Sequence, residues 1–329
     1  MNPQLKSIFS TEFGFAILRV MTPLLFPAIG VAITEMAGSI NIALEGIMLV
    51  SAFTGVIVSA FTGSILLALL AGVAAGMLMA ALLGYFHLKL KADIILAAIA
   101  LNMFASGITI FFLFVFAHDK GTTSSLKSLV FPKLDLPLIQ SIPVLGRILS
   151  GHNVLTYFAI LAVPLFFLIM YKTPLGLRIR AVGQNPRAAQ SVGINVDRIR
   201  LYALLLSGFF GAFGGLYLSM GYVSWFSRDM TAGRGWIAIA AATLGGNQPL
   251  GTFIASFLFG TVNALAIYIA SLRIPSEFIQ LIPYLATVIA LTFYSARAMK
   301  KKTRSAHPGG AAAVRQSPGK EAANPIEKD

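Results

Sequence analysis

The sequence predicts an all-α, polytopic transmembrane helical bundle of about eight to ten membrane segments, some of them broken or re-entrant. Two observations carry this fold class. Apolar residues make up 57% of the chain and charged residues only 11%, whereas a water-soluble domain carries roughly 25% charged residues. Several apolar runs also exceed the length of about 18–20 residues that spans a hydrocarbon core. A chain this poor in charge cannot cover a water-facing surface, so a soluble protein is excluded.

The apolar stretches give the order of the membrane segments. We expect spans at 14–34, 41–61, 63–86, 94–116, 154–171, 201–220, 237–271 (a composite) and 278–295. The basic residues set their direction, because most of the net charge of +13 lies in 87–93, 172–200 and 296–329, each beside an apolar span. Such clusters are typical of the cytoplasmic side of membrane proteins. They do not form the folded basic face of a nucleic-acid-binding protein, so we expect contact with membrane lipid and no nucleic acid.

Counting crossings from these basic segments places the loop 117–153 outside and makes the composite 237–271 begin and end outside. That stretch is long enough for two short spans or for a hairpin that turns within the membrane. Its centre, LGGNQPLG at 244–251, has the glycine and proline content of a turn. Irregular backbone at membrane depth is tolerated only where protein or a water-filled cavity surrounds it. Asn247 and Gln248 are therefore expected inside the bundle or at its cytoplasmic mouth.

The two ends of the chain differ in character. The first span contains Pro23 and Pro27, so either it is broken or it places the N-terminus outside, and the sequence leaves both options open. The first residues lack a small-residue cleavage site after a short apolar core, and we expect no removable signal peptide. We divide the chain into a transmembrane domain, 1–295, and a basic cytoplasmic tail, 296–329, which lacks the apolar residues of a folded core and is expected to be disordered.

The polar segment GLRIRAVGQNPRAAQSVGINVDRIR, 176–200, contains a short helix signal. Asn185 is a favoured N-cap, Pro186 suits the first helical position, and Gly193 suits the residue past the end. A helix this short is marginal alone in water. It is either a topogenic loop that rests on lipid headgroups or a docking helix for a cytoplasmic partner.

Three segments together resemble a known family. The stretch 176–200 is similar to the cytoplasmic coupling loop of permease subunits in bacterial ATP-binding-cassette (ABC) importers, in the family that handles branched-chain amino acids, simple sugars and nucleosides. AGSINIALEGIMLVSAF at 37–53 resembles the early signature of that family, and GRGWIAIAAATLGGNQPLGTFIASFLFG at 233–260 resembles the late one. Within the family, INIALEG at 40–46 looks most like the nucleoside permeases.

The resemblance implies a permease subunit, in a bacterial cytoplasmic (inner) membrane, that imports a nucleoside or a related small polar solute. A simple sugar or a riboflavin-like solute is the alternative. The implied partners are a separate ABC ATPase docked on 173–200, a second permease subunit (identical or different), and a solute-binding protein or lipoprotein. The implied coupling residues are Gly183, Asn185, Pro186, Arg187, Ala188 and Gly193. The chain lacks the GxxxxGK[ST] phosphate loop, so ATP and magnesium are expected on the partner ATPase. This chain is expected to hold no cofactor and to be a transport subunit without enzyme activity.

Polar residues within the spans are candidates for the translocation path. A charge at membrane depth costs a few kcal/mol, so Arg19 and Glu45 need partners, and a mutual ion pair is our favoured interpretation. The alternative is that Glu45 or Asn41 contacts the solute. Asn102 either lines the path or bonds two helices together. The candidate path residues are Asn41, Glu45, Asn102, Asn247 and Gln248.

Two other function classes fit the sequence less well. An ion-gradient-driven secondary transporter usually has titratable residues near the membrane midplane, and this chain has very few. A membrane-embedded metalloenzyme would need a motif such as HExxH, but the four histidines flank spans or lie in the tail. The absence of cysteine excludes disulfides and a thiolate metal site.

Overall fold

The computed structural model describes residues 11–135, 137, 145–270, 285, 288 and 292. Within them, seven helices are long and apolar enough to cross a membrane: α2 (Thr11–Met36), α3 (Leu44–Thr62), α4 (Ile65–Gly84) continued by the π-helical η1 (Tyr85–Lys89), α5 (Ile94–Ala117), α8 (Val154–Lys172), α11 (Val196–Met220) and α13 (Pro249–Ala270). This confirms the all-α membrane bundle. Most of the expected span 278–295, and the whole tail 296–329, lie outside the described residues.

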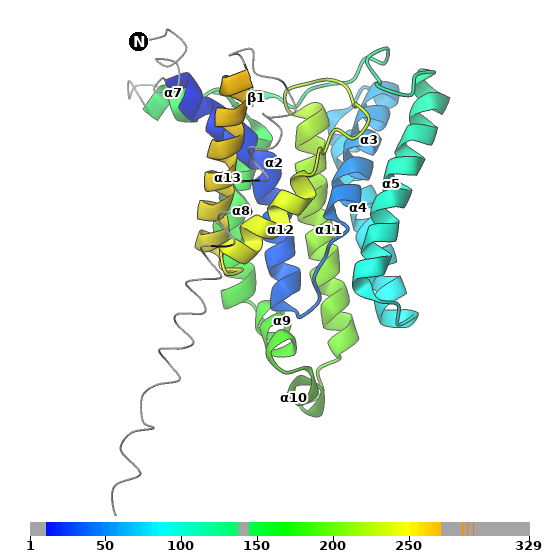
Figure 1. Cartoon of the computed structure of the whole chain (residues 1–329), viewed down its shortest axis with the longest axis vertical. Helices are drawn as coiled ribbons and strands as arrows, with labels where there is room; N and C mark the ends of the chain where they lie inside the picture. Colours follow the sequence, from blue (N-terminus) through cyan, green and yellow to red (C-terminus); the bar gives the residue numbers. More distant parts are fainter. Residues whose placement is uncertain are drawn as a thin grey trace, which may run out of the picture. The chain divides into compact units, whose positions relative to one another are not determined.

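The shorter elements lie at the two ends of the bundle and within it. They are α7 (Leu145–Leu149), α9 (Pro174–Gln184), α10 (Pro186–Ser191), α12 (Arg234–Leu244), and an antiparallel pair of two-residue strands, β1 (Lys133–Leu134) and β2 (His152–Asn153). Figure 1 shows α9 and α10 at one end of the bundle and α7 and β1 at the other.

Helix α2 runs without interruption through Pro23 and Pro27, so the first span is not broken. Packing explains how the prolines are accommodated. A Cβ on Gly214 of α11 would lie 3.0 Å from Pro27 Cδ and 3.3 Å from the Pro23 carbonyl oxygen. The neighbouring helix therefore covers the proline turn closely, where the helix lacks two backbone donors.

Helix α11 is the central element, in contact with α2, α3 and α4 (Figure 1). Its glycines allow the helices to approach closely. A Cβ on Gly215 would lie 2.0 Å from the Met48 carbonyl oxygen of α3, and one on Gly208 would lie 2.6 Å from Ala80 Cβ of α4. Small residues at helix contacts are the usual way to assemble membrane helices, where burial of apolar surface gives little driving force.

The described part of the composite stretch, residues 237–270, is a hairpin. Helix α12 crosses the bundle obliquely near its middle, the chain turns through 245–248, and α13 rises to the end at which α11 finishes (Figure 1). The turn contains Gly246 and Asn247 with positive φ values of 61° and 58°, a conformation for which glycine and asparagine are suited. The structure thus has the hairpin in place of two short spans, with one short helix followed by one that is long enough to cross a membrane.

Candidate functional site

Helix α12 is capped by a side chain from another helix. Its N-cap residue is Gly233, which has no side chain to supply the bond. The Glu45 carboxylate at the start of α3 accepts hydrogen bonds from the backbone N–H groups of Gly233 and Gly235, each at 2.7 Å. A carboxylate at a helix N-terminus satisfies backbone donors and complements the helix dipole. Glu45 therefore caps the start of this 11-residue helix.

A second carboxylate holds the other end of α12. Glu35, in the last turn of α2, accepts hydrogen bonds from the Thr243 hydroxyl at 3.3 Å and from the Asn247 side-chain amide. The neighbouring Gln248 accepts a hydrogen bond from the Tyr171 hydroxyl of α8. Asn247 is half-buried within the bundle and Gln248 is exposed at its edge. The two ends of helix α12 are therefore each bound by a carboxylate, Glu45 of α3 at its start and Glu35 of α2 at its end.

Asn41 and Asn102 stabilise the non-helical segment 37–43 between α2 and α3. Asn41 is fully buried; its Oδ1 accepts from the Ala43 N–H and its Nδ2 donates to Ser207 Oγ, both at 3.0 Å. Asn102 of α5 accepts from the Gly46 N–H at 2.8 Å and donates to the Ile42 carbonyl at 3.0 Å. Backbone groups without a helical partner need such bonds away from water. In this arrangement both asparagines join helices together.

The expected ion pair between Arg19 and Glu45 is wrong. The Arg19 guanidinium lies 5.1 Å from the centre of the Tyr222 ring, over its face, a favourable position for a cation. Glu45 is occupied by the backbone donors of α12. The ion pair was expected because the sequence shows only which side chains could pair with one another. The actual partners of Glu45 are backbone N–H groups at the start of a helix, which residue types do not reveal.

A cluster of side chains around His152 adjoins Arg19 at the α7 end of the bundle, and sequence reasoning missed it. The His152 ring stacks on Phe15 with centroids 3.8 Å apart. It donates from Nε2 to the Ile148 carbonyl at 2.9 Å and accepts at Nδ1 from the Tyr222 hydroxyl at 3.3 Å. Burial lowers the pKa of His152 below its ordinary value, and the nearby Arg19 charge lowers it further. Burial also raises the pKa of Tyr222, which keeps that hydroxyl a donor.

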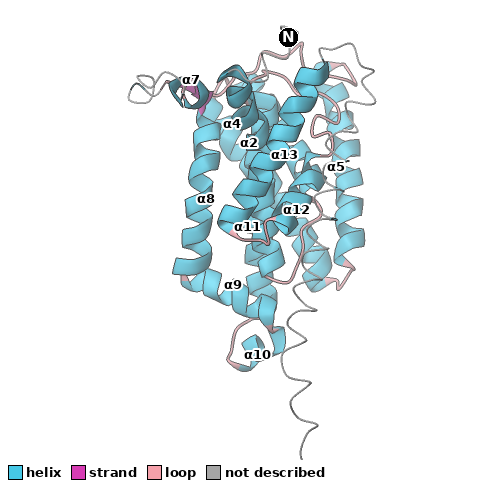
Figure 2. Cartoon of the chain, turned by 60° about the vertical axis from the view of Figure 1, so that its left-hand side comes forward, coloured by secondary structure: helices cyan, strands magenta, loops and turns pink. Residues whose placement is uncertain are grey.

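The predicted short helix of the polar segment is present as α10, and Figure 2 shows it beyond α9 at the end of the bundle. Asn185 caps it by accepting from the Ala188 N–H at 3.1 Å, Pro186 is its first residue, and Gly193 follows it with φ of 83°. Arg187 and Ala188 are exposed, so the helix offers its outer face to solvent.

Gly183 joins this segment to the bundle. A Cβ on Gly183 of α9 would lie 2.0 Å from the Met36 carbonyl oxygen, the last residue of α2. The same glycine lies beside Gly38, whose added Cβ would be 3.4 Å from Gly183 Cα. The backbones of α9 and of the end of α2 are therefore in direct contact here, without a side chain between them. Glu35 is the residue before Met36 in the sequence.

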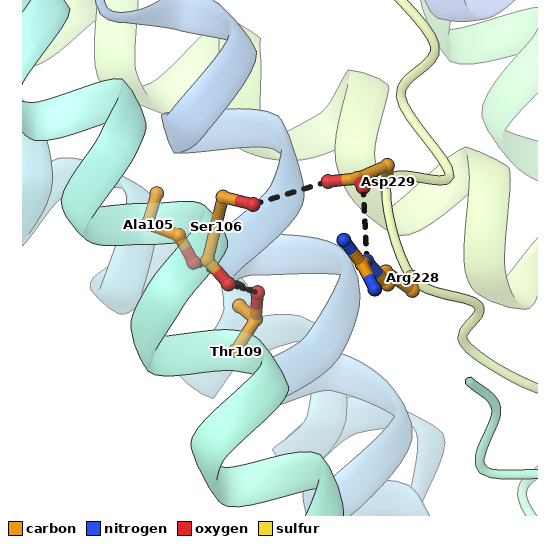
Figure 3. A network of polar contacts seen from close by, with 5 residues as sticks. All are labelled: Ala105, Ser106, Thr109, Arg228 and Asp229. Atoms are coloured by element: carbon orange, nitrogen blue, oxygen red, sulfur yellow. Dashed lines mark hydrogen bonds and ion pairs between the residues drawn. The ribbon is translucent and has the colours of Figure 1, made fainter. Parts of the chain in front are cut away.

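A polar network links α5 to the chain that leads into α12 (Figure 3). Ser106 Oγ donates to Asp229 Oδ1 at 3.1 Å, and Arg228 Nε donates to Asp229 Oδ2 at 3.3 Å. Sequence reasoning did not single out these residues, because Ser106 and Asp229 are far apart in the chain and each type is common. In the described part of the chain, no three histidine, aspartate or glutamate side chains gather as a metal site would require.

Known proteins resemble this chain over most of its length. A family model described as "Branched-chain amino acid transport system / permease component" matches residues 14–291. The nucleoside ABC transporter permease protein NupC of Lactococcus lactis subsp. cremoris is 35% identical, with 85% of this chain and 91% of that protein covered. The guanosine ABC transporter permease protein NupQ of Bacillus subtilis is 36% identical (86% and 92% covered). The glucose ABC transporter permease protein TsgB13 of Haloferax volcanii is 26% identical (86% and 77% covered).

Solved structures agree on the fold. PsaBC from Streptococcus pneumoniae, solved in complex with a Fab, matches with a TM-score of 0.52 at 13% identity, covering 87% of this chain and 94% of the other. An ABC transporter in an inward-facing conformation gives the same TM-score at 15% identity, covering 89% of each chain.

Proposed function

We infer the function of the chain from its family, since it belongs to the permease components of branched-chain amino acid transport systems. We propose that it forms the membrane path of an ABC importer for a nucleoside or a related small polar solute. The observation that carries the solute class is the identity of 35–36% to a nucleoside permease and a guanosine permease over most of each chain. A simple sugar is the second candidate, supported by the likeness to a glucose permease.

The proposed assembly needs partners on both sides of the membrane. A separate ABC ATPase would dock on 173–200, where α10 exposes Arg187 and Ala188. A second permease subunit would complete the path, and a solute-binding protein or lipoprotein would deliver the solute outside. ATP and magnesium would bind the ATPase. This orientation puts the α9–α10 end and the tail 296–329 in the cytoplasm, as the basic residues favour.

The proposed solute contacts lie around α12. The Asn247 Oδ1 atom is buried and accepts no hydrogen bond from any described residue. It can therefore accept one from a solute hydroxyl or base N–H group, which would remove the cost of a buried unpaired acceptor. Glu45 and Gln248 stand at the two ends of the same helix. Asn41 and Asn102 would act behind them, by holding the segment from which Glu45 projects.

The proposed coupling route is a chain of direct contacts. Displacement of α10 by the ATPase moves α9, and α9 touches the end of α2 through Gly183. The adjoining Glu35 holds the end of α12, so a shift of α2 changes the position of the re-entrant helix. Packed helices respond to such a push by moving between discrete arrangements.

The docking role is tested by Arg187→Glu combined with Ala188→Asp. Both side chains are exposed, so we expect normal insertion and stability. We expect ATP-dependent nucleoside uptake into vesicles to fall by about tenfold or more, because a reversed charge at an interface costs a few kcal/mol. Lys133→Glu, an exposed charge reversal at the opposite end, is the matched control. Normal uptake by the double variant would contradict the docking role.

The orientation has its own test, since the chain contains no cysteine. Arg187→Cys gives a single reactive thiol. A membrane-impermeant maleimide should label it in inverted vesicles and leave it unlabelled in intact cells. Labelling in intact cells would reverse the proposed topology.

A further inference from the structure

An apolar groove of about 500 Å³ lies between α4, η1 and α11, at the α9–α10 end of the bundle. Its walls include Leu78 and Leu82 on α4, Tyr85 on η1 and Leu201 on α11. Leu78 and Tyr85 are more than half exposed, although both belong to a membrane-crossing helix. From Leu78 to the end of η1 the groove follows roughly three helical turns, about 16 Å. Its wall therefore faces the bilayer along much of one leaflet.

Basic side chains stand at one end of this groove. Lys89, the last residue of η1, and Arg198, in the first turn of α11, both line it and are exposed. Asp197 also lines it, but its carboxylate pairs with Lys91 Nζ at 3.7 Å. Neither Lys89 nor Arg198 forms an ion pair with a described residue. The end of the groove therefore carries an uncompensated positive charge next to an apolar channel.

A neighbouring groove of about 490 Å³ provides an internal comparison. It lies between α4, η1 and α5, shares Leu82 with the first groove, and is lined by apolar side chains such as Phe86 and Leu96 without any charged residue. The two grooves have the same size and face the same leaflet. They differ in charge, because only the first groove has basic side chains at its end. Size and apolar lining therefore do not distinguish the two grooves.

We propose that the groove lined by Lys89 and Arg198 is a binding site for an anionic phospholipid of that leaflet. An acyl chain lies along the wall from Leu78 to Tyr85, and the phosphate lies between the ammonium and guanidinium groups. Basic residues beside membrane helices attract anionic headgroups, and guanidinium pairs with phosphate through charge-assisted hydrogen bonds. Free phosphate would leave the apolar channel empty. The inference rests on the membrane placement of the family and is independent of the transported solute.

The test is a lipid titration of the full chain in mild detergent, followed by native mass spectrometry. Phosphatidylglycerol and phosphatidylcholine with identical acyl chains are the probes. We expect the chain to bind phosphatidylglycerol roughly tenfold to thirtyfold more tightly, as two basic groups near a headgroup allow. Lys89→Gln with Arg198→Gln should abolish that preference. Lys172→Gln with Arg178→Gln removes two exposed charges at the same end of the bundle and should preserve it.

Substitutions that fill each groove test the contribution of its apolar lining to lipid binding separately from that of the basic residues. Ala81→Phe places a ring in the first groove, and Ala97→Phe does the same in the second. The first variant should lose the tightly bound phosphatidylglycerol and the second should keep it.

Equal affinity of the unaltered chain for the two lipids would overturn the inference, as would equal behaviour of the two glutamine pairs. A change from dimer to monomer on filling the first groove would assign it to a second copy of the chain and would also overturn it. Solute uptake is not measured, so failure of the lipid site leaves the importer proposal intact.

Discussion

Six of the seven membrane helices form two sets, with α13 in neither, and the more buried set is the less apolar one, which is the reverse of soluble proteins. In α2, α3 and α11, 89%, 61% and 67% of the most apolar window is buried, against 28%, 22% and 33% in α4, α5 and α8. The buried set is the less apolar of the two, and it carries the prolines of α2, Glu45 and the close-packed glycines of α11. In lipid, apolar side chains gain little by leaving acyl chains for protein, so the interior depends on close contacts and hydrogen bonds.

The difference explains where function can reside. Both carboxylates that hold α12 come from the buried set, from the end of α2 and the start of α3. The outer helices contribute broad apolar surface, and their polar contacts are few: Asn102 of α5 bonds to Gly46 of α3, and Tyr171 of α8 bonds to the exposed Gln248. Substitutions of one kind should therefore have very different consequences in the two sets.

The largest contrast is expected for glycine to alanine. Gly215→Ala places a Cβ 2.0 Å from the Met48 carbonyl oxygen, so α3 and α11 must separate, and we expect a loss of about 3 kcal/mol or more. Gly107→Ala on α5 meets nothing within 4 Å and should be neutral or stabilising by up to about 1 kcal/mol. Thermal unfolding in mild detergent measures both. Equal stability of the two variants would remove the distinction between the helix sets.

The next largest effect is expected at the Glu45 carboxylate, which caps the start of α12 from another helix. Glu45→Ala removes the acceptor for the Gly233 and Gly235 N–H groups and should cost about 1.5–3 kcal/mol, since both bonds go to a charged group. Hydrogen exchange of the first turn of α12 should accelerate, and nucleoside uptake should fall. Glu45→Gln keeps one acceptor oxygen and should be intermediate, while the exposed Glu12→Gln serves as the control. Unchanged exchange at Gly233–Ile237 in Glu45→Ala would show that the cap is dispensable.

A smaller contrast lies within α5 itself. Asn102→Ala leaves the Gly46 N–H and the Ile42 carbonyl without their partner, at a cost of about 1–3 kcal/mol. Ser106→Ala, one turn further on, removes an exposed bond to Asp229 and should change stability by less than about 0.5 kcal/mol. The same thermal assay compares them. A larger loss from Ser106→Ala would indicate that the network of Figure 3 is the more important support.

The smallest effect is a pH dependence at the α7 end. Burial lowers the pKa of His152 in the folded chain, so the unfolded chain takes up a proton first as the pH falls below about 6.5. Stability should be constant above that pH and decline between it and the lower folded pKa. His152→Gln should flatten the decline in thermal unfolding measured from pH 8 to pH 5. A decline of equal slope in that variant would assign the pH dependence to another group.

Most of the fold was predictable from the sequence, and the positions of helix ends were the less predictable part. The spans at 63–86, 94–116 and 154–171 match α4 with η1, α5 and α8 within a few residues. Helix α11 begins at Val196, five residues before the expected span at 201, because Asn195 caps it and it continues past the membrane with Arg198 and Arg200. Hydropathy marks where the membrane ends, whereas caps mark where a helix ends.

The site was predictable only where its signals are local. Asn185, Pro186 and Gly193 define α10 through neighbouring residues, and the structure has that helix. The partners of Glu45 are backbone groups 188 and 190 positions away, and backbone donors carry no residue-type signal. The contact of Gly183 with Met36 is equally invisible, since it appears in the sequence only as one glycine among thirty.

The glycine contacts of α11 also impose an order on biosynthesis. Helices α2, α3 and α4 leave the ribosome well before α11, and each must wait with the surface that packs on α11 uncovered. Chains fold from the N-terminus as they are made, so in a nascent chain shorter than about 196 residues these three helices lack the partner that packs among them. Arrival of α11 fills the space between these three helices, and α12 and α13 add their contacts with α2 afterwards. A variant that delays or misplaces this helix should therefore be removed by membrane quality-control proteases before transport could be assayed.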